Sequence, residues 1–398
     1  MKILMVNKFL YYRGGAETYF LKIGKYLESR GHQVEYFGMF DEKNVVGNQD
    51  ELYTENMDFH TSSLKKLLYP FRIIYSFDAA KKITKIIKRF QPDVIHLNNI
   101  NFQLTPSIIE AAAKLKVPVV QTVHDYQMLC PNHLMYSEVY GGVCERCLHG
   151  SSWNCAKGSC IHGSRVKSII GSVEAQLYKM LGTYKKVQKY ICPSYFMEKK
   201  LLENPIYHGK TVAMHNFIEM LPECEKEAEE KYVLFFGRLS EEKGLDVFLQ
   251  ACRELPGIRF VIAGSGPMEE VCKGIPNVDF VGFKVGEELN RLIGNAYFSV
   301  YPSIWYENCP LSVLESEMLG TPVLASEMGG IPELIQENET GMLLEELTVD
   351  CMKGTIEKLY ADKAKVEHMS EKCMQNRESL VTLEKYCDFL LEIYGQVV

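Results

Sequence analysis

Short apolar runs rich in β-branched residues alternate with amphipathic stretches along almost the whole chain, and this alternation occurs twice. Such runs are typical of buried parallel strands, and the amphipathic stretches are typical of the helices that connect them. Predicted strands cover Lys2–Val6, Gln33–Phe37, Asp93–Leu97, Val117–Val123, Lys189–Cys192, Tyr232–Phe236, Arg259–Ala263, Val278–Val281, Phe298–Tyr301 and Pro322–Ala325. Predicted helices include Glu17–Arg30, Lys81–Phe90, Leu245–Glu254 and Leu311–Leu319. The pattern predicts an α/β fold with two doubly wound parallel-sheet domains.

An acidic segment without apolar periodicity, Glu219–Lys231, separates the two alternating regions. A chain of 398 residues is also too long for one core of ordinary size. We therefore predict a first domain over residues 1–212, a linker over 213–230 and a second domain over 231–375. Residues 376–398 are predicted to form a final helix that crosses back to the first domain. Such sheets bind ligands at the carboxyl ends of their strands, so we expect a ligand cleft between the domains.

Composition and charge narrow the class of protein. With 46% hydrophobic and 24% charged residues, the composition is that of an ordinary globular protein. No apolar run approaches the roughly 18 residues of a membrane-spanning helix, and Met1–Val6 is too short for a signal-peptide core. These features exclude secreted, fibrous and transmembrane proteins and leave a cytosolic enzyme or binding protein. Residues 1–200 carry 27 Lys and Arg against 17 Asp and Glu, and the remainder carry 17 against 34. This asymmetry indicates two domains with different partners or, alternatively, drift in surface charge.

The segment Tyr301–Glu315 carries the strongest chemical signal. A strand is predicted to end at Tyr301, and Pro310 after the loop suits the first position of a helix. Free N–H groups at the start of that helix form an anion site suited to a diphosphate. Glu307 precedes the helix, and Glu315, inside it, suits the two hydroxyls of a ribose. Taken alone, these carboxylates are equally consistent with a loop glutamate and a surface helix glutamate.

Two cations follow the first predicted strand of the second domain. The stretch Leu234–Gly244 is predicted to run from strand through turn to helix start, which places Arg238 and Lys243 at the carboxyl end of that strand. Cations at this position neutralise a diphosphate and stabilise it as a leaving group. The alternative is a pair of solvated turn residues. On the functional interpretation, alanine at either position abolishes activity and leaves the fold intact.

Five short motifs occur in the second half of the chain in a fixed order. They are Phe-Gly-Arg238-Leu with Glu-Lys243-Gly, Val-Ile-Ala-Gly264-Ser-Gly266-Pro, Glu307 and Glu315 with seven residues between them, Gly320-Thr-Pro322-Val, and Gly329-Gly330-Ile-Pro332-Glu333. In this order and spacing the sequence resembles glycosyltransferase family 4, over nearly the whole chain. The first half contributes Gly14-Gly15-Ala16-Glu17 after the first strand and His124-Asp125 at the end of another. Gly329-Gly330 is equally consistent with a tight turn and with a ligand cradle.

The resemblance implies the GT-B fold, in which two Rossmann-like domains face each other across a cleft. It also implies a retaining glycosyltransferase of the hexosyltransferase type that needs no metal for catalysis. Such an enzyme moves a sugar from a nucleotide-diphosphate donor, UDP in preference to GDP, to a hydroxyl of a lipid-linked or saccharide acceptor. Bacterial surface-polysaccharide assembly is the implied pathway. The alternatives are a sugar-nucleotide epimerase of the same fold and a non-catalytic, zinc-containing binder of nucleotide sugars.

The resemblance also implies a role for each candidate residue. Arg238 and Lys243 bind the donor diphosphate, Glu307 contacts hydroxyls of the donor sugar, and Glu315 holds the ribose. Glu307 is interpreted as an electrostatic and positioning group, because the implied mechanism has no covalent intermediate. The remaining donor-site candidates are Gly14 and Gly15 at the phosphates, His124 at the donor sugar, and the backbone of Asn308, Cys309, Pro310 and Leu311. For His124 the alternative is a core histidine that neighbouring backbone satisfies.

Five of the 13 cysteines fall within residues 130–160. Cys144 and Cys147 form a C-x-x-C pair, and Cys155 and Cys160 follow at spacings compatible with one tetrahedral zinc site. Disulfides are not expected without a secretion signal. We interpret residues 130–162 as an insertion on the acceptor side that a structural zinc ion orders. The alternative is a set of reduced thiols in a glycine-rich loop.

A basic and aromatic segment, Lys65–Phe90, holds eight Lys or Arg and one acidic residue, and Gly163–Lys200 adds further basic residues. Such a surface suits an anionic bilayer, with each basic residue contributing about 1 kcal/mol near the headgroups. Together with the resemblance, it predicts a cytoplasmic protein bound peripherally to the cytoplasmic membrane face. The alternative is an amphipathic helix pair with a solvated basic face. Nucleic acid is not an expected partner, because the net charge is −7 and no recognised motif is present.

Overall fold

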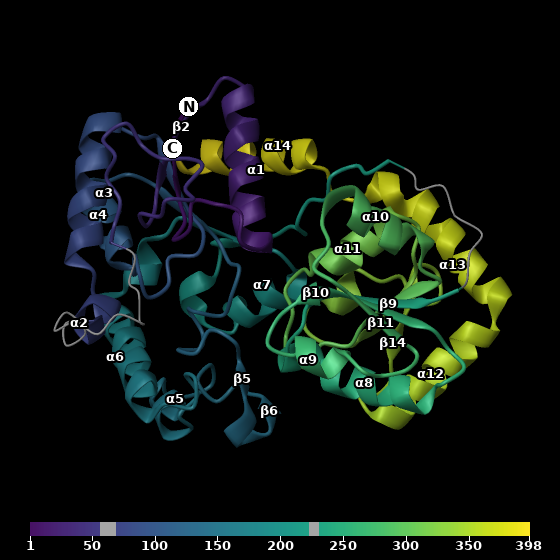
Figure 1. The fold of residues 1–398 in the computed structure, drawn as a ribbon. Helices are drawn as coiled ribbons and strands as arrows, with labels where there is room; N and C mark the ends of the chain where they lie inside the picture. Colours follow the sequence, from purple (N-terminus) through teal and green to yellow (C-terminus); the bar gives the residue numbers. More distant parts are fainter. Residues whose placement is uncertain (56–68, 223–230) are drawn as a thin grey trace. The chain divides into compact units, whose positions relative to one another are not determined.

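The computed structural model describes residues 1–55, 69–222 and 231–398 (Figure 1). The chain divides into two compact units, one formed by Met1–Asn216 with Leu383–Val398 and the other by Phe217–Thr382. In the described residues, each unit contains one six-stranded parallel sheet with helices in the connections. The predicted α/β class with two doubly wound parallel sheets is thereby confirmed. Within the same residues, no helix has both the length and the apolar character needed to cross a bilayer.

The sheet of the first unit has the strand order β2-β1-β3-β4-β7-β8. Its strands are β1 (Lys2–Val6), β2 (Gln33–Phe37), β3 (Val94–Leu97), β4 (Val119–Thr122), β7 (Lys189–Cys192) and β8 (Thr211–Ala213). Its helices are α1 (Gly15–Ser29), α2 (Tyr69–Ile74), α3 (Phe77–Phe90), α4 (Ser107–Lys114), α5 (Trp153–Lys157), α6 (Arg165–Leu181), α7 (Tyr195–Leu202) and α14 (Leu383–Val397). A two-stranded hairpin, β5 (Tyr136–Ser137) and β6 (Gly142–Val143), precedes α5. Strands β3 and β4 are buried at every position, which explains their continuous apolar sequences.

The sheet of the second unit has the order β11-β10-β9-β12-β13-β14. Its strands are β9 (Val233–Arg238), β10 (Phe260–Ser265), β11 (Val278–Gly282), β12 (Phe298–Tyr301), β13 (Val323–Ser326) and β14 (Gly341–Leu344). Its helices are α8 (Leu245–Glu254), α9 (Glu269–Cys272), α10 (Gly286–Asn295), α11 (Leu311–Met318), α12 (Val349–Ala361) and α13 (Lys363–Asn376). This is the strand order of dinucleotide-binding folds, whose ligand crevice lies where the order reverses. Here the reversal lies between β9 and β12, which places the expected ligand crevice at the carboxyl ends of these two strands.

The limits of the units differ from the predicted domain limits. The backbone N–H of Ile218 donates to the carbonyl of Val381 at 2.9 Å, and Ile218 and Leu221 pack into the core around α11. These contacts assign residues 217–222 of the predicted linker to the second unit, while residues 223–230 lie outside the described residues. Helix α14 begins at Leu383 and packs beside α1 within the first unit (Figure 1).

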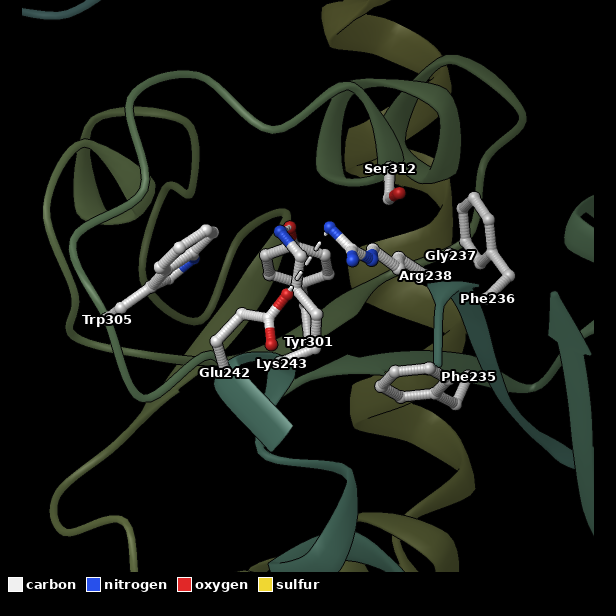
Figure 2. Close-up of a pocket in the computed structure, with 9 residues that line it drawn as sticks. All are labelled: Phe235, Phe236, Gly237, Arg238, Glu242, Lys243, Tyr301, Trp305 and Ser312. Carbon is white, nitrogen blue, oxygen red and sulfur yellow. Dashed lines mark hydrogen bonds and ion pairs between the residues drawn. The ribbon is translucent and has the colours of Figure 1, made fainter. Parts of the chain in front are cut away.

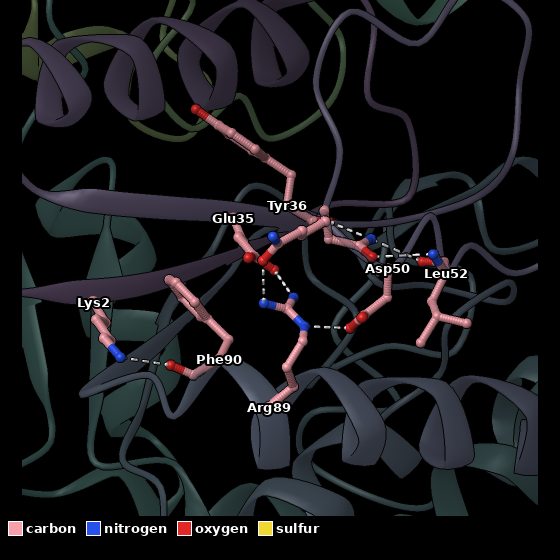
Figure 3. A network of polar contacts seen from close by, with 9 residues as sticks. Lys2, Glu35, Tyr36, Asp50, Leu52, Arg89 and Phe90 are labelled. Carbon is pink, nitrogen blue, oxygen red and sulfur yellow. Dashed lines mark hydrogen bonds and ion pairs between the residues drawn. The ribbon is translucent and has the colours of Figure 1, made fainter.

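An ionic network ties α3 to the edge of the first sheet (Figure 3). Arg89 of α3 donates to Asp50 at 2.5 Å through Nε and to Glu35 of β2 through Nη2. The ammonium of Lys2 donates to the carbonyl of Phe90 at 3.2 Å. Arg89, one of the basic residues of the segment Lys65–Phe90, is therefore paired within the fold rather than presented to a partner.

Candidate active site

A pocket of about 280 Å³ lies at the carboxyl ends of β9 and β12, where the strand order of the second unit reverses. Its walls are formed by Phe235, Phe236, Gly237, Arg238, Glu242, Lys243, Tyr301, Trp305 and Ser312 (Figure 2). Arg238 is the last residue of β9 and Tyr301 the last of β12, and Lys243 ends a short 3-10 turn after β9. The two predicted diphosphate ligands, Arg238 and Lys243, therefore line one pocket.

Lys243 and Glu307 form a buried ion pair beside this pocket. The Lys243 ammonium lies 2.5 Å from Glu307 Oε1 and donates to the Tyr301 hydroxyl at 3.0 Å. The hydroxyl of Ser303 and the indole N–H of Trp305 donate to the same Oε1 at 2.9 and 2.6 Å. Because an ammonium group has three N–H donors, these two contacts leave a third for a ligand oxygen. The carboxylate of Glu307 is held by three convergent donors.

The electrostatics of the pair keep both groups charged. Burial alone raises the pKa of Glu307, but the Lys243 charge and the hydrogen bonds outweigh it, and the pKa lies below its ordinary value. Burial alone lowers the pKa of Lys243, but Tyr301 and Glu307 outweigh it, and the pKa lies above its ordinary value. A fixed cation and a fixed anion that are largely buried act more strongly on charge that develops nearby than they would in water. The site is therefore suited to separating a negative leaving group from a positively charged centre.

A glycine pair fixes the backbone of Glu307. The N–H of Gly330 donates to the carbonyl of Glu307 at 2.7 Å, and Gly329 adopts a φ of +66°. A Cβ added to Gly329 would lie 2.1 Å from that carbonyl oxygen. These contacts favour the tight-turn interpretation of Gly329-Gly330, with the turn packed directly against the residue that carries the carboxylate.

Helix α11 begins at Leu311, as predicted, with Pro310 at its N-cap rather than at its first helical position. No side chain caps this end, and Ser312 of its first turn lines the pocket. An uncapped helix start presents N–H groups and partial positive charge, which suits an anion. Glu315 lies three residues after Ser312, one turn along the same face of the helix, and is not among the residues that line the pocket. Cys309 is buried in the core against α11, so its backbone alone remains for a ligand.

Arg238 is the exposed cation of the site. Its side chain is 67% exposed, and its guanidinium lies 3.8 Å from the Glu242 carboxylate. An exposed pair at this distance contributes little to stability, so Arg238 reorients toward a ligand at little cost. Lys243, held by Tyr301 and Glu307, is by contrast already in position.

Three residues that hold the ion pair, namely Tyr301, Ser303 and Trp305, are not among the candidates that the sequence predicts. All lie in the segment that precedes Glu307, and the spacing of that segment does not show where their polar atoms point. The sequence does offer one signal for these contacts, namely Trp305. It is a large side chain with one polar atom, and it stands two residues before the predicted functional carboxylate of Glu307.

The predicted glycines of the first unit lie at the start of α1. This helix begins at Gly15 with Gly14 as its N-cap, and no side chain caps it. Both glycines are exposed, whereas Glu17 in the first turn is buried. The helix start thus presents backbone N–H groups at the surface of the first unit, as the predicted phosphate contact requires.

His124, two residues after the end of β4, is held by side chains of the first unit. Its Nε2 lies 2.9 Å from Asn98 Oδ1, and its ring packs edge-on against Tyr19 of α1 at 4.9 Å between ring centroids. Burial lowers the pKa of His124 to about 4, which the charge of Asp125 only partly offsets. The imidazole is therefore neutral at physiological pH.

The structure does not gather the sulfurs of Cys144, Cys147, Cys155 and Cys160 into one group. Within the described residues, only one set of three potential metal ligands has its ligand atoms within 4.8 Å of one another. This set is Glu145, His149 and Glu203. The thiol of Cys147 lies 4.0 Å from the Ser152 carbonyl, and that of Cys160 lies 3.5 Å from the Ser137 hydroxyl. Cys155 interacts with Cys160, and Cys130 interacts with Cys147, but no three of these sulfurs lie within that mutual distance in the described residues. Zinc at these cysteines stays a prediction for metal analysis of the purified protein.

Two α/β units with parallel sheets, one of which carries a cationic pocket where its strand order reverses, are the architecture of the GT-B fold. The model of "Glycosyltransferase Family 4" matches residues 13–220, and that of "Glycosyl transferases group 1" matches residues 217–376. The chain belongs to glycosyltransferase family 4.

Several known proteins are similar to this chain. An uncharacterized 42.6 kDa protein from the cps region of Klebsiella pneumoniae is 25% identical over 354 residues, which are 84% of this chain and 87% of that protein. The O-antigen biosynthesis glycosyltransferase WbnH of Escherichia coli is 29% identical over 224 residues, which are 54% of this chain and 61% of its own length. The crystal structure of Anabaena Alr3699/HepE in complex with UDP has a TM-score of 0.72 at 17% identity and covers 100% of both chains. At this identity the structural likeness shows the fold alone.

Proposed function

We propose that the protein is a retaining glycosyltransferase that moves a sugar from a UDP-sugar to a hydroxyl of a lipid-linked or saccharide acceptor. The observation that carries the proposal is the pocket at the carboxyl ends of β9 and β12, where the strand order of the second unit reverses. There the Lys243–Glu307 pair, Arg238 and the uncapped start of α11 converge. The name of the Escherichia coli relative, an O-antigen biosynthesis glycosyltransferase, supports a role in surface-polysaccharide assembly.

In this proposal the cations hold the leaving diphosphate. Arg238 turns to one phosphate, the third N–H of Lys243 reaches the other, and the start of α11 adds backbone N–H groups. The bond from the anomeric carbon to the diphosphate oxygen breaks, and the diphosphate keeps the electron pair. The acceptor oxygen forms the new bond on the same face and gives its proton to the departing phosphate. Glu307 stabilises the positive charge of the sugar ring, and the rigid donors on its Oε1 keep that carboxylate in place.

The other candidates complete the donor site in this proposal. Glu315 accepts hydrogen bonds from the ribose hydroxyls, and the backbone of Asn308–Leu311 lines the sugar and phosphates. From the first unit, Gly14 and Gly15 contribute N–H groups to the phosphates and neutral His124 contacts the donor sugar. The Anabaena protein that was crystallised with UDP supports UDP as the nucleotide. No described contact favours an epimerase or a non-catalytic binder over transfer.

Calorimetric titration with UDP, GDP and ADP tests the donor site without knowledge of the sugar. We expect UDP to bind best, and we expect Glu315→Ala to weaken it about 10- to 100-fold, since hydrogen bonds to a charged group are worth about 1.5–3 kcal/mol. Glu254→Ala, an exposed glutamate paired with Lys353 at the end of α8, is the matched control and should bind as the wild type does. Absence of binding for all three nucleotides, or equal affinity of Glu315→Ala and wild type, contradicts the assignment.

We further propose that α6 with α2 forms a surface that binds the cytoplasmic membrane face. Exposed apolar side chains on these neighbouring helices include Phe71, Val166 and Met180, which are 71%, 68% and 73% exposed. Exposed basic residues of the same stretch are Arg165, Lys167, Lys179 and Lys185. Apolar and basic side chains together suit an anionic bilayer. Lys65, Lys66, Leu67 and Leu68, also predicted for this surface, lie outside the described residues.

Co-sedimentation with vesicles that contain phosphatidylglycerol tests this surface. We expect Val166→Asp combined with Met180→Asp to reduce binding about ten-fold or more, because the change removes two apolar contacts and adds two negative charges. Val45→Asp, on an exposed loop of the same unit, should leave binding unchanged. Equal binding of the double variant and the control would exclude α6 as the contact surface.

A further inference from the structure

Five buried polar side chains form a continuous hydrogen-bonded chain inside the first unit. The hydroxyl of Tyr386 lies 2.8 Å from that of Tyr19, which lies 3.0 Å from Thr122 Oγ1. Thr122 Oγ1 lies 2.8 Å from His96 Nε2, and His96 Nδ1 lies 2.6 Å from the hydroxyl of Tyr394. All five side chains are at most 4% exposed. Tyr386 and Tyr394 belong to α14, so one helix supplies the first and the last residue of this hydrogen-bonded series.

The members of this chain depend on one another. Burial, with a smaller contribution from the charge of His124, lowers the pKa of His96 to about 3, so its ring carries a single N–H at neutral pH. One ring nitrogen then donates and the other accepts, which makes all the hydroxyls along the chain point in one direction. Removal of one hydroxyl takes one hydrogen bond from a buried neighbour and so weakens the restraint on that neighbour's position.

Tyr19 connects this chain to the candidate site. The same ring whose hydroxyl is fixed by Tyr386 and Thr122 packs edge-on against the imidazole of His124, at an interplanar angle of 79°. His124 follows Thr122 by two residues. The hydrogen-bonded series therefore holds both the end of β4, through Thr122, and the Tyr19 ring that packs against His124. On its other side, His124 contacts Asn98.

We propose that Tyr19 and Tyr386 are positioning residues for His124. Helix α14 fixes the hydroxyl of Tyr19 and thereby sets the orientation of the imidazole. Any effect of this orientation on turnover rests on the function proposed for His124. The orientation of the imidazole itself does not depend on that function. A purely structural role for the two tyrosines predicts loss of stability without a specific change at His124.

Histidine side-chain NMR of the full chain tests the positioning directly. The His124 ring signal is assigned by its absence in His124→Gln. We expect Tyr386→Phe and Tyr19→Phe to shift or broaden this signal at pH 7. Tyr190→Phe, which also removes a buried hydroxyl of the first unit, one bonded to the Tyr184 carbonyl at 2.6 Å, should leave it unchanged. A His124 signal that is the same in Tyr386→Phe and in wild type overturns the proposal.

A double-variant cycle separates the positioning from the proposed function. The probe is UDP release from UDP-glucose. We expect Tyr386→Phe to lower kcat about five-fold in the wild type and to have no further effect in His124→Ala. If Tyr386→Phe lowers kcat by the same factor in His124→Ala as in the wild type, Tyr386 acts through the fold and the proposal is overturned. If the NMR signal shifts but His124→Ala turns over normally, the positioning holds and the proposed function of His124 fails. If UDP-glucose is not turned over, the NMR comparison decides alone.

Discussion

Replacement of Lys243 by methionine is expected to lower the free energy of unfolding of the second unit by about 3–5 kcal/mol and to remove nucleotide binding. The reason is the buried pair with Glu307, whose side chains are 17% and 10% exposed. Removal of the cation leaves a carboxylate that burial penalises and that keeps only the Ser303 and Trp305 donors. Because Trp153 and Trp305 are the two tryptophans of the chain, urea unfolding in a Trp153→Phe background reports on the second unit through Trp305.

The double variant Lys243→Met with Glu307→Gln is the matched control. It removes both charges, so we expect it to recover most of the lost stability without recovering UDP binding. The pH dependence has a definite sign: because the pKa of Glu307 is lowered, the stabilisation is present above the unfolded value of about 4.3 and is lost as the pH falls below it. The difference in stability between the single variant and wild type should therefore shrink as the pH falls below about 4.3. Equal stability of the single and double variants at pH 7 would contradict the paired arrangement.

Replacement of Gly329 by alanine is expected to cost about 3 kcal/mol or more of stability and to lower transfer at least 100-fold. The added Cβ would lie 2.1 Å from the carbonyl oxygen of Glu307, and the φ of +66° is unfavourable for any side chain. Backbone atoms cannot rotate away, so the loop that carries Glu307 must shift. Urea unfolding through Trp305 measures the first effect, and UDP release in an acceptor assay measures the second.

Gly257 provides the comparison for this variant. A Cβ added there meets no atom within 4 Å, so Gly257→Ala should be close to neutral. If Gly329→Ala retains full activity with an unchanged unfolding curve, the turn does not fix Glu307, and the ligand-cradle interpretation of the glycine pair regains weight.

Much of the fold was predictable from the sequence, because buried parallel strands are continuous apolar runs. The two strands of the large sheets that the pattern did not reveal, β8 and β14, show its limit. Thr211–Ala213 is short and only half-buried at a sheet edge, and Gly341–Leu344 begins with glycine and has no β-branched residue. Neither segment produces a hydrophobic pattern of its own, since pairing with the neighbouring strand stabilises it.

The residues of the site were predictable one by one, but their mutual contacts were not. Lys243 and Glu307 lie 64 residues apart, and no spacing rule shows that they neutralise each other. The expectation that alanine at Lys243 leaves the fold intact stays untested, but the buried pair with Glu307 leads us to expect a loss of stability instead. For exposed Arg238 the same expectation stays a prediction. Trp305 was missed because the direction of its indole N–H depends on the loop conformation.

The placement of α14 in the first unit has a consequence for biosynthesis. Tyr19 and its partner Tyr386 are separated by 367 residues, and a ribosome that adds about 5–20 residues per second needs roughly 20–70 s to bridge them. During this interval the first unit exists without the helix that covers α1 and closes its buried hydroxyl chain. Nascent chains lack this helix for tens of seconds, so we expect a fragment of the first unit without α14 to aggregate more readily than the full chain.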